Sequence, residues 1–273
     1  MKPALSRRIR STVWIVSGLL LLFLASVSNA DYAPGAGIAG TPHDFSGYSA
    51  GANQRSGGTA KTGACVFCHT PHKSYRTRLL WNHTHPPTDY NWGNYTVTAG
   101  GTTLPTIQST WEGATVFCLS CHDGTVARGD IAWFNRRSWT GAAALDLDKV
   151  TIGHVSDPFD IAEFLKGMMG SNHPVAVPYP YLQVRNTYNS VTTGPRVPVA
   201  NYRSDPTPLG IRLFSNPTGQ QVVAGATSGR TGIECTSCHG AHNEKGVVVD
   251  KPFLRGLRGG DSGNLCSKCH VNM

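Results

Sequence analysis

The sequence predicts a mostly irregular fold with short α-helices and a small β element, and three observations predict it. The chain has 31 glycines and 17 prolines in 273 residues, a composition that favours turns and coil over long regular elements. Charged residues make up only 15% of the chain, and few stretches show an apolar period of helix length. All eight cysteines fall into four C-x-x-C-H motifs, which indicates a fold organised around these motifs.

Each motif has two cysteines separated by two residues, and a histidine directly follows the second cysteine. This is the pattern of covalent haem attachment, in which the cysteines form thioether bonds and the histidine is an axial iron ligand. The predicted attachment residues are Cys65, Cys68, Cys118, Cys121, Cys235, Cys238, Cys266 and Cys269. The predicted proximal iron ligands are His69, His122, His239 and His270. The sequence therefore predicts four haem c groups.

C-x-x-C pairs also occur in structural zinc sites and in disulfide frameworks, and the spacing alone allows either. The histidines favour haem, because placing one of 11 histidines after all four pairs by chance has a probability of roughly a few in a million. Four porphyrins are large apolar discs, so their burial replaces side-chain packing. The expected fold is thus a multihaem cytochrome fold organised around four covalent haems, with short helices that start at the motifs.

Residues 1–30 are typical of a cleaved signal peptide. Basic residues precede an apolar stretch from about Val13 to Ala25, and the small residues Ser28 and Ala30 are placed for cleavage. The stretch is shorter than the roughly 20 residues of a membrane-spanning helix, although an uncleaved anchor is the alternative. We expect an exported protein without a membrane span, extracellular or at the cell surface, or alternatively periplasmic.

The formal charge of +8 falls once the signal peptide is removed. The signal carries four of the 24 basic residues and no acidic one, which leaves 20 basic against 16 acidic residues and a formal charge of +4. No basic run survives cleavage, so nucleic-acid binding is not expected.

Residues 31–273 are expected to form a single tetrahaem cytochrome domain, with haem pair one at about 31–150 and haem pair two at about 151–273. Motifs one and three are followed by a further histidine ("CHTPH" and "CHGAH"), which indicates a duplication.

Between the pairs lie the β-prone runs "VAVPYPY" and "IRLFSNPTGQQVV". The "SNPTG" of the second run predicts a hairpin turn.

The further histidines, His72 and His242, raise a question of reach. His69 approaches the iron from the face held by the thioethers, so its partner must come around the ring from the opposite face. Two intervening residues, at roughly 3.5 Å each, cannot span that path. His72 and His242 are therefore predicted to ligate a neighbouring haem, and a polar loop role is the alternative.

Seven histidines remain for the four distal positions: His43, His72, His83, His85, His154, His173 and His242. An electron carrier closes both axial positions of its iron, whereas a multihaem enzyme keeps one open for substrate. The surplus favours a carrier without catalytic residues, although a spare histidine can also act as an acid or base beside an open haem. All-histidine ligation is expected.

Eight stretches across the chain resemble the secreted multihaem cytochromes with doubled C-x-x-C-H motifs, especially the extracellular tetrahaem cytochrome-nanowire subunits (outer-membrane cytochrome E type). They are "GTPHDFS" (40–46), "CVFCHTPH" (65–72), "LWNH" (80–83), "CLSCHDGTVA" (118–127), "NHPV" (172–175), "ECTSCHGAH" (234–242), "FLR" (253–255) and "LCSKCH" (265–270). The resemblance implies that the distal iron ligands are His43, His72, His173 and His242. His83, His85 or His154 replacing one of them is the alternative.

The resemblance also implies a partner, namely further copies of the same chain. His43 follows the glycine-rich arm "APGAGIAGTP", and an arm that donates it to a haem of the second pair in the next copy makes a head-to-tail contact that grows into an open filament. The leading expectation is an extracellular conductive filament for long-range electron transport. A monomeric periplasmic or surface electron shuttle is the alternative, and a multihaem reductase is a further one. Upstream and downstream redox proteins or extracellular acceptors are the other expected partners.

Overall fold

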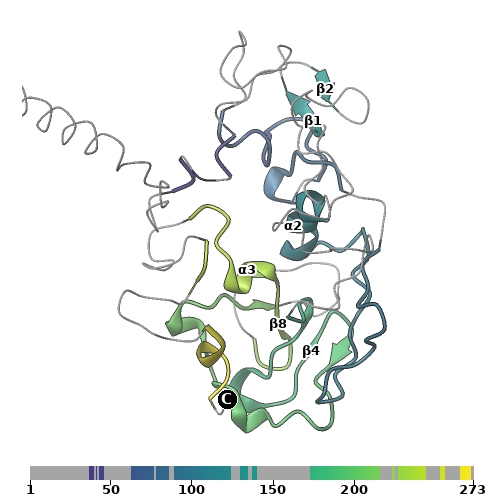
Figure 1. Cartoon of the computed structure of the whole chain (residues 1–273), viewed down its shortest axis with the longest axis vertical. Coiled ribbons are helices and arrows are strands. Elements are labelled where there is room, and N and C mark those ends of the chain that lie inside the picture. Colours follow the sequence, from purple (N-terminus) through teal and green to yellow (C-terminus); the bar gives the residue numbers. More distant parts are fainter. Residues whose placement is uncertain are drawn as a thin grey trace, which may run out of the picture. The chain divides into compact units, whose positions relative to one another are not determined.

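Both α-helices that the structure describes contain the two cysteines of a C-x-x-C-H motif (Figure 1). The computed structural model describes residues 37–39, 41, 43–45, 63–76, 78–85, 89–123, 130–134, 137–139, 173–215, 223–224, 227–243, 253–255 and 265–271. Helix α2 (Ala114–His122) carries the second motif at its end, and α3 (Cys235–Cys238) begins on the first cysteine of the third. The 3-10 helix η7 (Leu265–Lys268) covers most of the fourth.

The first motif forms a single helical turn, in which His69 N donates to Cys65 O at 2.8 Å. This is the i to i−4 bond of an α-helix. The expected helical structure at the motifs is therefore present. The expected starting point is wrong for α2, which begins at Ala114, upstream of Cys118.

Helix α2 depends on tertiary contacts at both its face and its start. Its side chains Val116, Phe117 and Leu119 are buried. Gly113 precedes it with extended backbone and offers no capping side chain. The first N–H groups of a helix have no partner inside the helix. A residue distant in sequence supplies the missing partner: the carboxylate of Glu234, directly before the third motif, accepts a hydrogen bond from Thr115 N.

A four-stranded antiparallel sheet, in the order β3-β8-β6-β7, leads directly into the third motif. Its strands are β3 (Val177–Pro178), β6 (Phe214–Ser215), β7 (Val223–Ala224) and β8 (Thr231–Ile233). Strand β8 pairs with β3 through Ile233 and Val177, and with β6 through Gly232 and Phe214. Because α3 follows β8 after one residue, the sheet fixes where the third motif begins.

The pairing of β6 with β7 confirms the hairpin predicted from "IRLFSNPTGQQVV", while its turn, residues 216–222, lies outside the described residues. Two more hairpins were not predicted. They are β1 (Ile131–Phe134) with β2 (Arg137–Trp139), and β4 (Thr187–Tyr188) with β5 (Val191–Thr192). Short 3-10 helices are η1 (Arg78–Leu80), η4 (Tyr181–Gln183), η5 (Val199–Asn201) and η6 (Thr207–Leu209). The prediction of a mostly irregular chain with short helices and small β elements is confirmed.

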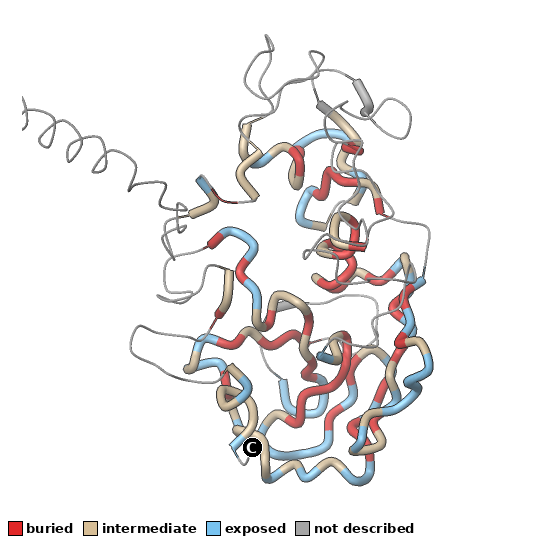
Figure 2. The backbone as a smooth tube through the Cα atoms, viewed as in Figure 1, coloured by how far each residue is buried: buried red, intermediate tan, exposed pale blue. Residues whose placement is uncertain are grey.

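An aromatic cluster forms the main core of the described residues, and its members lie on the buried parts of the tube in Figure 2. It contains Trp81, Tyr90, Trp92, Trp111, Phe117 and Tyr188, together with smaller apolar residues such as Ile107 and Leu119. Each such large side chain contributes about 1.5 to 3 kcal/mol when it is fully buried. Tyr90 OH donates to Asp123 Oδ2 at 2.6 Å, which ties the core to the end of α2, whereas the buried Trp81 Nε1 has no hydrogen-bond partner among the described residues.

Residues Pro34–Met273 form one compact unit. The predicted signal peptide, residues 1–30, lies outside the described residues, and so does the predicted boundary near residue 150 between the two haem pairs. Within the described part of the chain, we find no helix that is long and apolar enough to cross a membrane.

Candidate functional site

All eight motif cysteines are free thiols, so no disulfide bridge joins the motifs and the disulfide alternative gains no support. The two cysteines and the histidine of each motif share one helical turn. His69, His239 and His270 each donate a backbone N–H to the carbonyl of the first cysteine of their motif, at 2.8, 3.0 and 2.8 Å. A turn of this kind brings both thiols and the imidazole to one side of the backbone, as two thioether bonds and an axial ligand on one porphyrin require.

The first motif is held by an antiparallel bridge to the segment Leu80–Asn82. Thr70 N donates to Leu80 O at 2.8 Å, and Asn82 N donates to Cys68 O at 2.9 Å. The residue after the motif histidine and the second cysteine of the motif are thus both fixed by one segment.

The third motif repeats this bridge with the segment Phe253–Arg255. Gly240 N donates to Phe253 O at 2.8 Å, and Arg255 N donates to Cys238 O at 2.6 Å. The positions match those of the first motif one for one. The duplication predicted from "CHTPH" and "CHGAH" stays a prediction, because the fourth motif, which has no second histidine, uses the same bridge.

The fourth motif uses the same bridge with a segment that precedes it in the chain, Asn201–Arg203. Val271 N donates to Asn201 O at 2.9 Å, and Arg203 N donates to Cys269 O at 2.8 Å. The sequence analysis quoted "LWNH" and "FLR" among the resembling stretches without giving them a structural role, and it did not name Asn201–Arg203. The three segments share a signal, since "LWN", "FLR" and "NYR" each have a polar side chain after an apolar or aromatic one.

The last side chain of each bridge segment also binds a backbone carbonyl of the motif. Asn82 Nδ2 donates to Val66 O, and Arg203 Nε donates to Ser267 O at 2.8 Å. Val66 and Ser267 occupy the same place in their motifs, directly after the first cysteine. Arg255 Nε donates to His239 O at 3.1 Å. These three side chains therefore hold the motif turns in shape.

The cysteines of the first three motifs lie beside one another in chain order. The thiol of Cys68 lies within electrostatic range of Cys121. Burial is the main cause that raises the pKa of Cys68 to about 12, and the charge of Cys121 adds to it. Cys118 and Cys235 share a side-chain hydrogen bond, which raises the pKa of Cys118 and lowers that of Cys235. This bond lies where α2 contacts α3 (Figure 1).

The third and fourth motifs are neighbours as well. Burial raises the pKa of Cys238 to about 11 and that of Cys269 to about 12, with further contributions from the nearby thiol of Cys266. Cys238 also lies within electrostatic range of Cys269. The four motifs therefore form an unbroken series in the order one, two, three, four.

Two predicted distal histidines lie opposite predicted proximal ones. The ring centroids of His43 and His122 are 6.1 Å apart, and those of His69 and His242 are 6.0 Å apart. A metal–imidazole bond is about 2 Å long and the ligating nitrogen lies about 1 Å from the ring centroid, so two imidazoles on opposite sides of one iron have centroids about 6 Å apart. The residues present therefore fit a bis-histidine haem iron.

The ring nitrogens have the arrangement that metal-ligating histidines usually have. Nδ1 bonds to a backbone carbonyl in His43 (Ala241 O, 2.9 Å) and in His69 (Leu79 O, 2.6 Å). His173 does the same with Pro174 O at 2.9 Å. A carbonyl at Nδ1 favours the tautomer with the proton on that nitrogen and leaves Nε2 as the free ligand atom.

The other predicted distal histidines differ in how well they are placed. His173 is exposed and lies within electrostatic range of His270. Burial chiefly, followed by the charge of His173, lowers the pKa of His270. His72 is exposed on the loop after the first motif, and no histidine ring within the described residues contacts its own. His154 lies outside the described residues.

His83 and His85 are buried, with 1% and 3% of their surfaces exposed. His83 Nδ1 bonds to Thr84 O at 3.0 Å. Neither ring nitrogen of His85 makes a hydrogen bond of normal geometry, although the Ser109 backbone lies close enough to favour its protonated form. Burial lowers the pKa of His85 to about 3, with the charge of Arg76 as the next cause. Its ring packs on Tyr75 and Phe117.

His43 finds its neighbours within its own chain. Its ring lies 4.8 Å from that of Phe253, and burial, the largest cause, lowers the pKa of His43. The expected acceptor of His43 in a second copy belongs to the second pair, whereas its neighbour here, His122, belongs to the first. Donation to a second copy stays a prediction, since the structure contains one chain.

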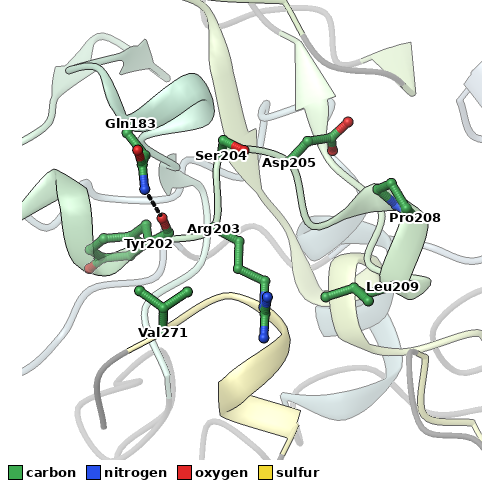
Figure 3. Close-up of a pocket in the computed structure, with 8 residues that line it drawn as sticks. All are labelled: Gln183, Tyr202, Arg203, Ser204, Asp205, Pro208, Leu209 and Val271. Carbon is green, nitrogen blue, oxygen red and sulfur yellow. Dashed lines mark hydrogen bonds between the residues drawn. The ribbon is translucent and has the colours of Figure 1, made fainter.

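An open hollow of about 380 Å³ adjoins the fourth motif (Figure 3). Arg203, Asp205, Leu209 and Val271 line it, and Gln183 Nε2 donates to Tyr202 O across one side at 2.8 Å. None of the predicted distal histidines lines this hollow. It therefore does not supply a second axial ligand.

The zinc alternative requires three or four side chains that converge on one point. No group of three or more His, Cys, Asp or Glu residues within the described ranges is arranged to hold a metal ion. A haem iron takes only two protein ligands, so this arrangement is compatible with haem. Compared with models of protein families and with curated proteins, the chain finds no match.

Proposed function

We propose that this protein is an electron-transfer protein with four covalent haem c groups, each with histidine on both sides of its iron. The single observation that carries the proposal is the facing of histidine rings from different segments at 6.0 and 6.1 Å, each pair containing the histidine of a C-x-x-C-H motif. The multihaem cytochrome fold is part of the proposal.

The contacts support a specific set of ligand pairs. His69 pairs with His242, His122 with His43, and His270 with His173. His239 and His72 are the two histidines of the proposed set that are left, and they form the fourth ligand pair. The duplication supports this last pair, because the histidine after the third motif serves the first iron, and the reciprocal exchange has the histidine after the first motif serve the third. The sequence-based distal set is thereby kept.

Bound haem supplies a one-electron iron couple, and the protein's residues decide what the couple can do. The paired imidazoles close both axial positions, so small ligands and substrates find no open iron. The backbone carbonyls at His43, His69 and His173 orient the ligating rings. The series of neighbouring motifs supports one continuous path for electrons from the first motif to the fourth.

An exported filament remains part of the proposal, and the resemblance to the nanowire subunits is its support. In that form, copies of the chain join head to tail, and the path continues from the fourth motif of one copy into the next. The second candidate is a monomeric shuttle in the periplasm or at the cell surface. The position of His43 beside His122 of its own chain favours this second form, because no ligand is then missing from a single copy.

Spectroscopy of the purified native protein tests the ligation. Oxidised and reduced absorption spectra should both be low-spin for all four haems, and the reduced protein should form no carbon monoxide adduct. Appreciable carbon monoxide binding would reveal an open iron and would favour the reductase alternative. Negative-stain microscopy of the same sample distinguishes the filament from the shuttle.

A further inference from the structure

The carboxylate of Glu234 is buried and accepts hydrogen bonds on both of its oxygens. Its side chain is 1% exposed and directly precedes the third motif. Oε1 accepts from Trp111 Nε1 at 3.2 Å and from Tyr188 OH at 2.7 Å. Oε2 accepts from Thr115 N at 3.0 Å and from the Thr115 hydroxyl. Four donors thus occupy the acceptor sites of one carboxylate.

This carboxylate lies at the junction between the second and third motifs. Thr115 belongs to the first turn of α2, which ends in the second motif, and its hydroxyl oxygen accepts from Cys235 N at 3.2 Å. The hydrogen bond between Cys118 and Cys235 lies at the same junction. Glu234 is therefore placed where the first pair of motifs meets the second.

Two glycines allow the donors to approach this closely. A Cβ atom at Gly113 would collide with the Trp111 indole nitrogen and with Glu234 Oε1. A Cβ atom at Gly232 would collide with the ring of Tyr188. Since any other residue has a Cβ atom, both positions are restricted to glycine by the packing around Glu234.

The donor set favours an ionised carboxylate. Trp111 Nε1–H and the Thr115 backbone N–H can only donate, and each occupies a different oxygen, so a carboxyl proton would have to replace the hydrogen bond donated by one of the two hydroxyls, that of Tyr188 or that of Thr115. The start of a nine-residue helix favours negative charge, and Arg78 lies within electrostatic range. Burial acts in the opposite direction and is the largest cause, so the pKa of Glu234 is raised overall, although the hydrogen bonds from Thr115, Tyr188 and Trp111 lower it.

We propose that Glu234 is a fixed buried anion that joins the two motif pairs and lowers the reduction potentials of the haems attached at Cys118 and Cys235. The inference rests on the proposed function, since it concerns the groups attached there. A negative charge in a water-poor junction stabilises the more positive, oxidised iron of its neighbours. Glu234 is thus a positioning residue that also sets the energy of the central step of the path.

Glu234→Gln keeps the shape of the side chain and removes its charge. In spectroelectrochemical titrations of the complete haem-loaded protein, two of the four haems should become easier to reduce, with the reduced-to-oxidised ratio at fixed potential rising roughly tenfold. Glu112, which lies just before the start of α2, is a half-buried acidic residue and serves as the control. Glu112→Gln makes the same charge change and should leave all four potentials unchanged. Tyr188→Phe removes one hydrogen bond and no charge, so it should lower the melting temperature without making any haem easier to reduce.

The outcomes separate this inference from the proposed function. Four haems of unchanged potential in Glu234→Gln overturn the inference alone, whereas a wild-type chain without covalent haem overturns the proposed function. If Glu234→Gln does not fold, infrared spectroscopy of the wild-type protein with labelled glutamate decides. The spectrum should lack the carbonyl band of a buried protonated glutamic acid, and such a band that disappears in Glu234→Asp would overturn the fixed anion.

Discussion

The imidazole rings of His69 and His242, one from the first motif and one from the loop after the third, have their centroids 6.0 Å apart. Neither residue could find the other through local structure, because the two segments meet only in the folded chain. Under the proposed function, the contact explains why a histidine three positions after a motif is useful although it cannot serve the haem of its own motif. It ties the first motif to the loop after the third.

Removing the distal member of this pair should open one iron. In His242→Ala, about one quarter of the haem should become high-spin and bind carbon monoxide after reduction, because one of the four distal axial positions is then vacant. Absorption spectra and carbon monoxide titration measure both effects. His72→Ala should open a different iron to the same extent, and four low-spin haems in either variant would contradict the exchange.

Dilution should show whether His43 ligates an iron of its own chain or an iron of a second copy. If its neighbour in its own chain, His122, is also its partner at the iron, a monomer at nanomolar concentration keeps four low-spin haems, because the ligand is intramolecular. If a second copy supplies His43, dilution produces one high-spin haem per chain. Spectra recorded alongside sedimentation measurements provide the answer, and His43→Ala marks the spectrum expected for a missing ligand.

Arg203→Ala should destabilise the fourth motif. The change removes the hydrogen bond from Arg203 Nε to Ser267 O and leaves a carbonyl of the motif turn without this donor, a loss of about 1 to 3 kcal/mol in the free energy of unfolding. Denaturant titration measures it. Arg230→Ala, at an exposed arginine, is the matched control and should stay within about 0.5 kcal/mol of wild type. Equal effects of the two changes would show that the bridge side chain has no structural role.

The buried imidazole of His85 should make the protein sensitive to acid. Its pKa is about 3 in the folded chain and about 6.5 in an unfolded one, so the unfolded chain binds the extra proton as the pH falls. The stability due to the neutral ring is complete above about pH 6.5 and is lost toward pH 3, at no more than about 1.4 kcal/mol per pH unit. In His85→Phe this part of the loss should disappear, while all four haems remain low-spin. A high-spin haem in that variant would instead identify His85 as an iron ligand.

Replacing all eight motif cysteines with alanine should unfold the chain. Covalent haem supplies much of the apolar core in the proposed fold, and the formation of such sites is coupled to folding. Circular dichroism with a thermal scan measures the result. A cooperative transition in this variant would mean that the aromatic cluster around Trp81 and Tyr90 suffices without haem.

Local patterns were readable before the fold was known. The motif spacing predicted helical turns at the cysteines, and "IRLFSNPTGQQVV" predicted the β6–β7 hairpin, because both features depend on residues close together in the chain. The pairing of the bridge segments with the motifs was not predicted, because each segment has only three residues and no periodic pattern. The segment Asn201–Arg203 was the hardest to foresee, since it reaches its motif from the opposite direction along the chain.

By itself, the sequence determined which residues are the candidates for the proposed chemistry: eight cysteines and four histidines in fixed local spacing, and an excess of further histidines. Only the tertiary structure decided which histidine faces which, that the motifs follow one another in space, and that Glu234 lies between the second and third. The physical reason is range. A C-x-x-C-H turn is held by hydrogen bonds within five residues, whereas the meeting of His43 with His122 or of Glu234 with Trp111 depends on packing between segments far apart in the chain.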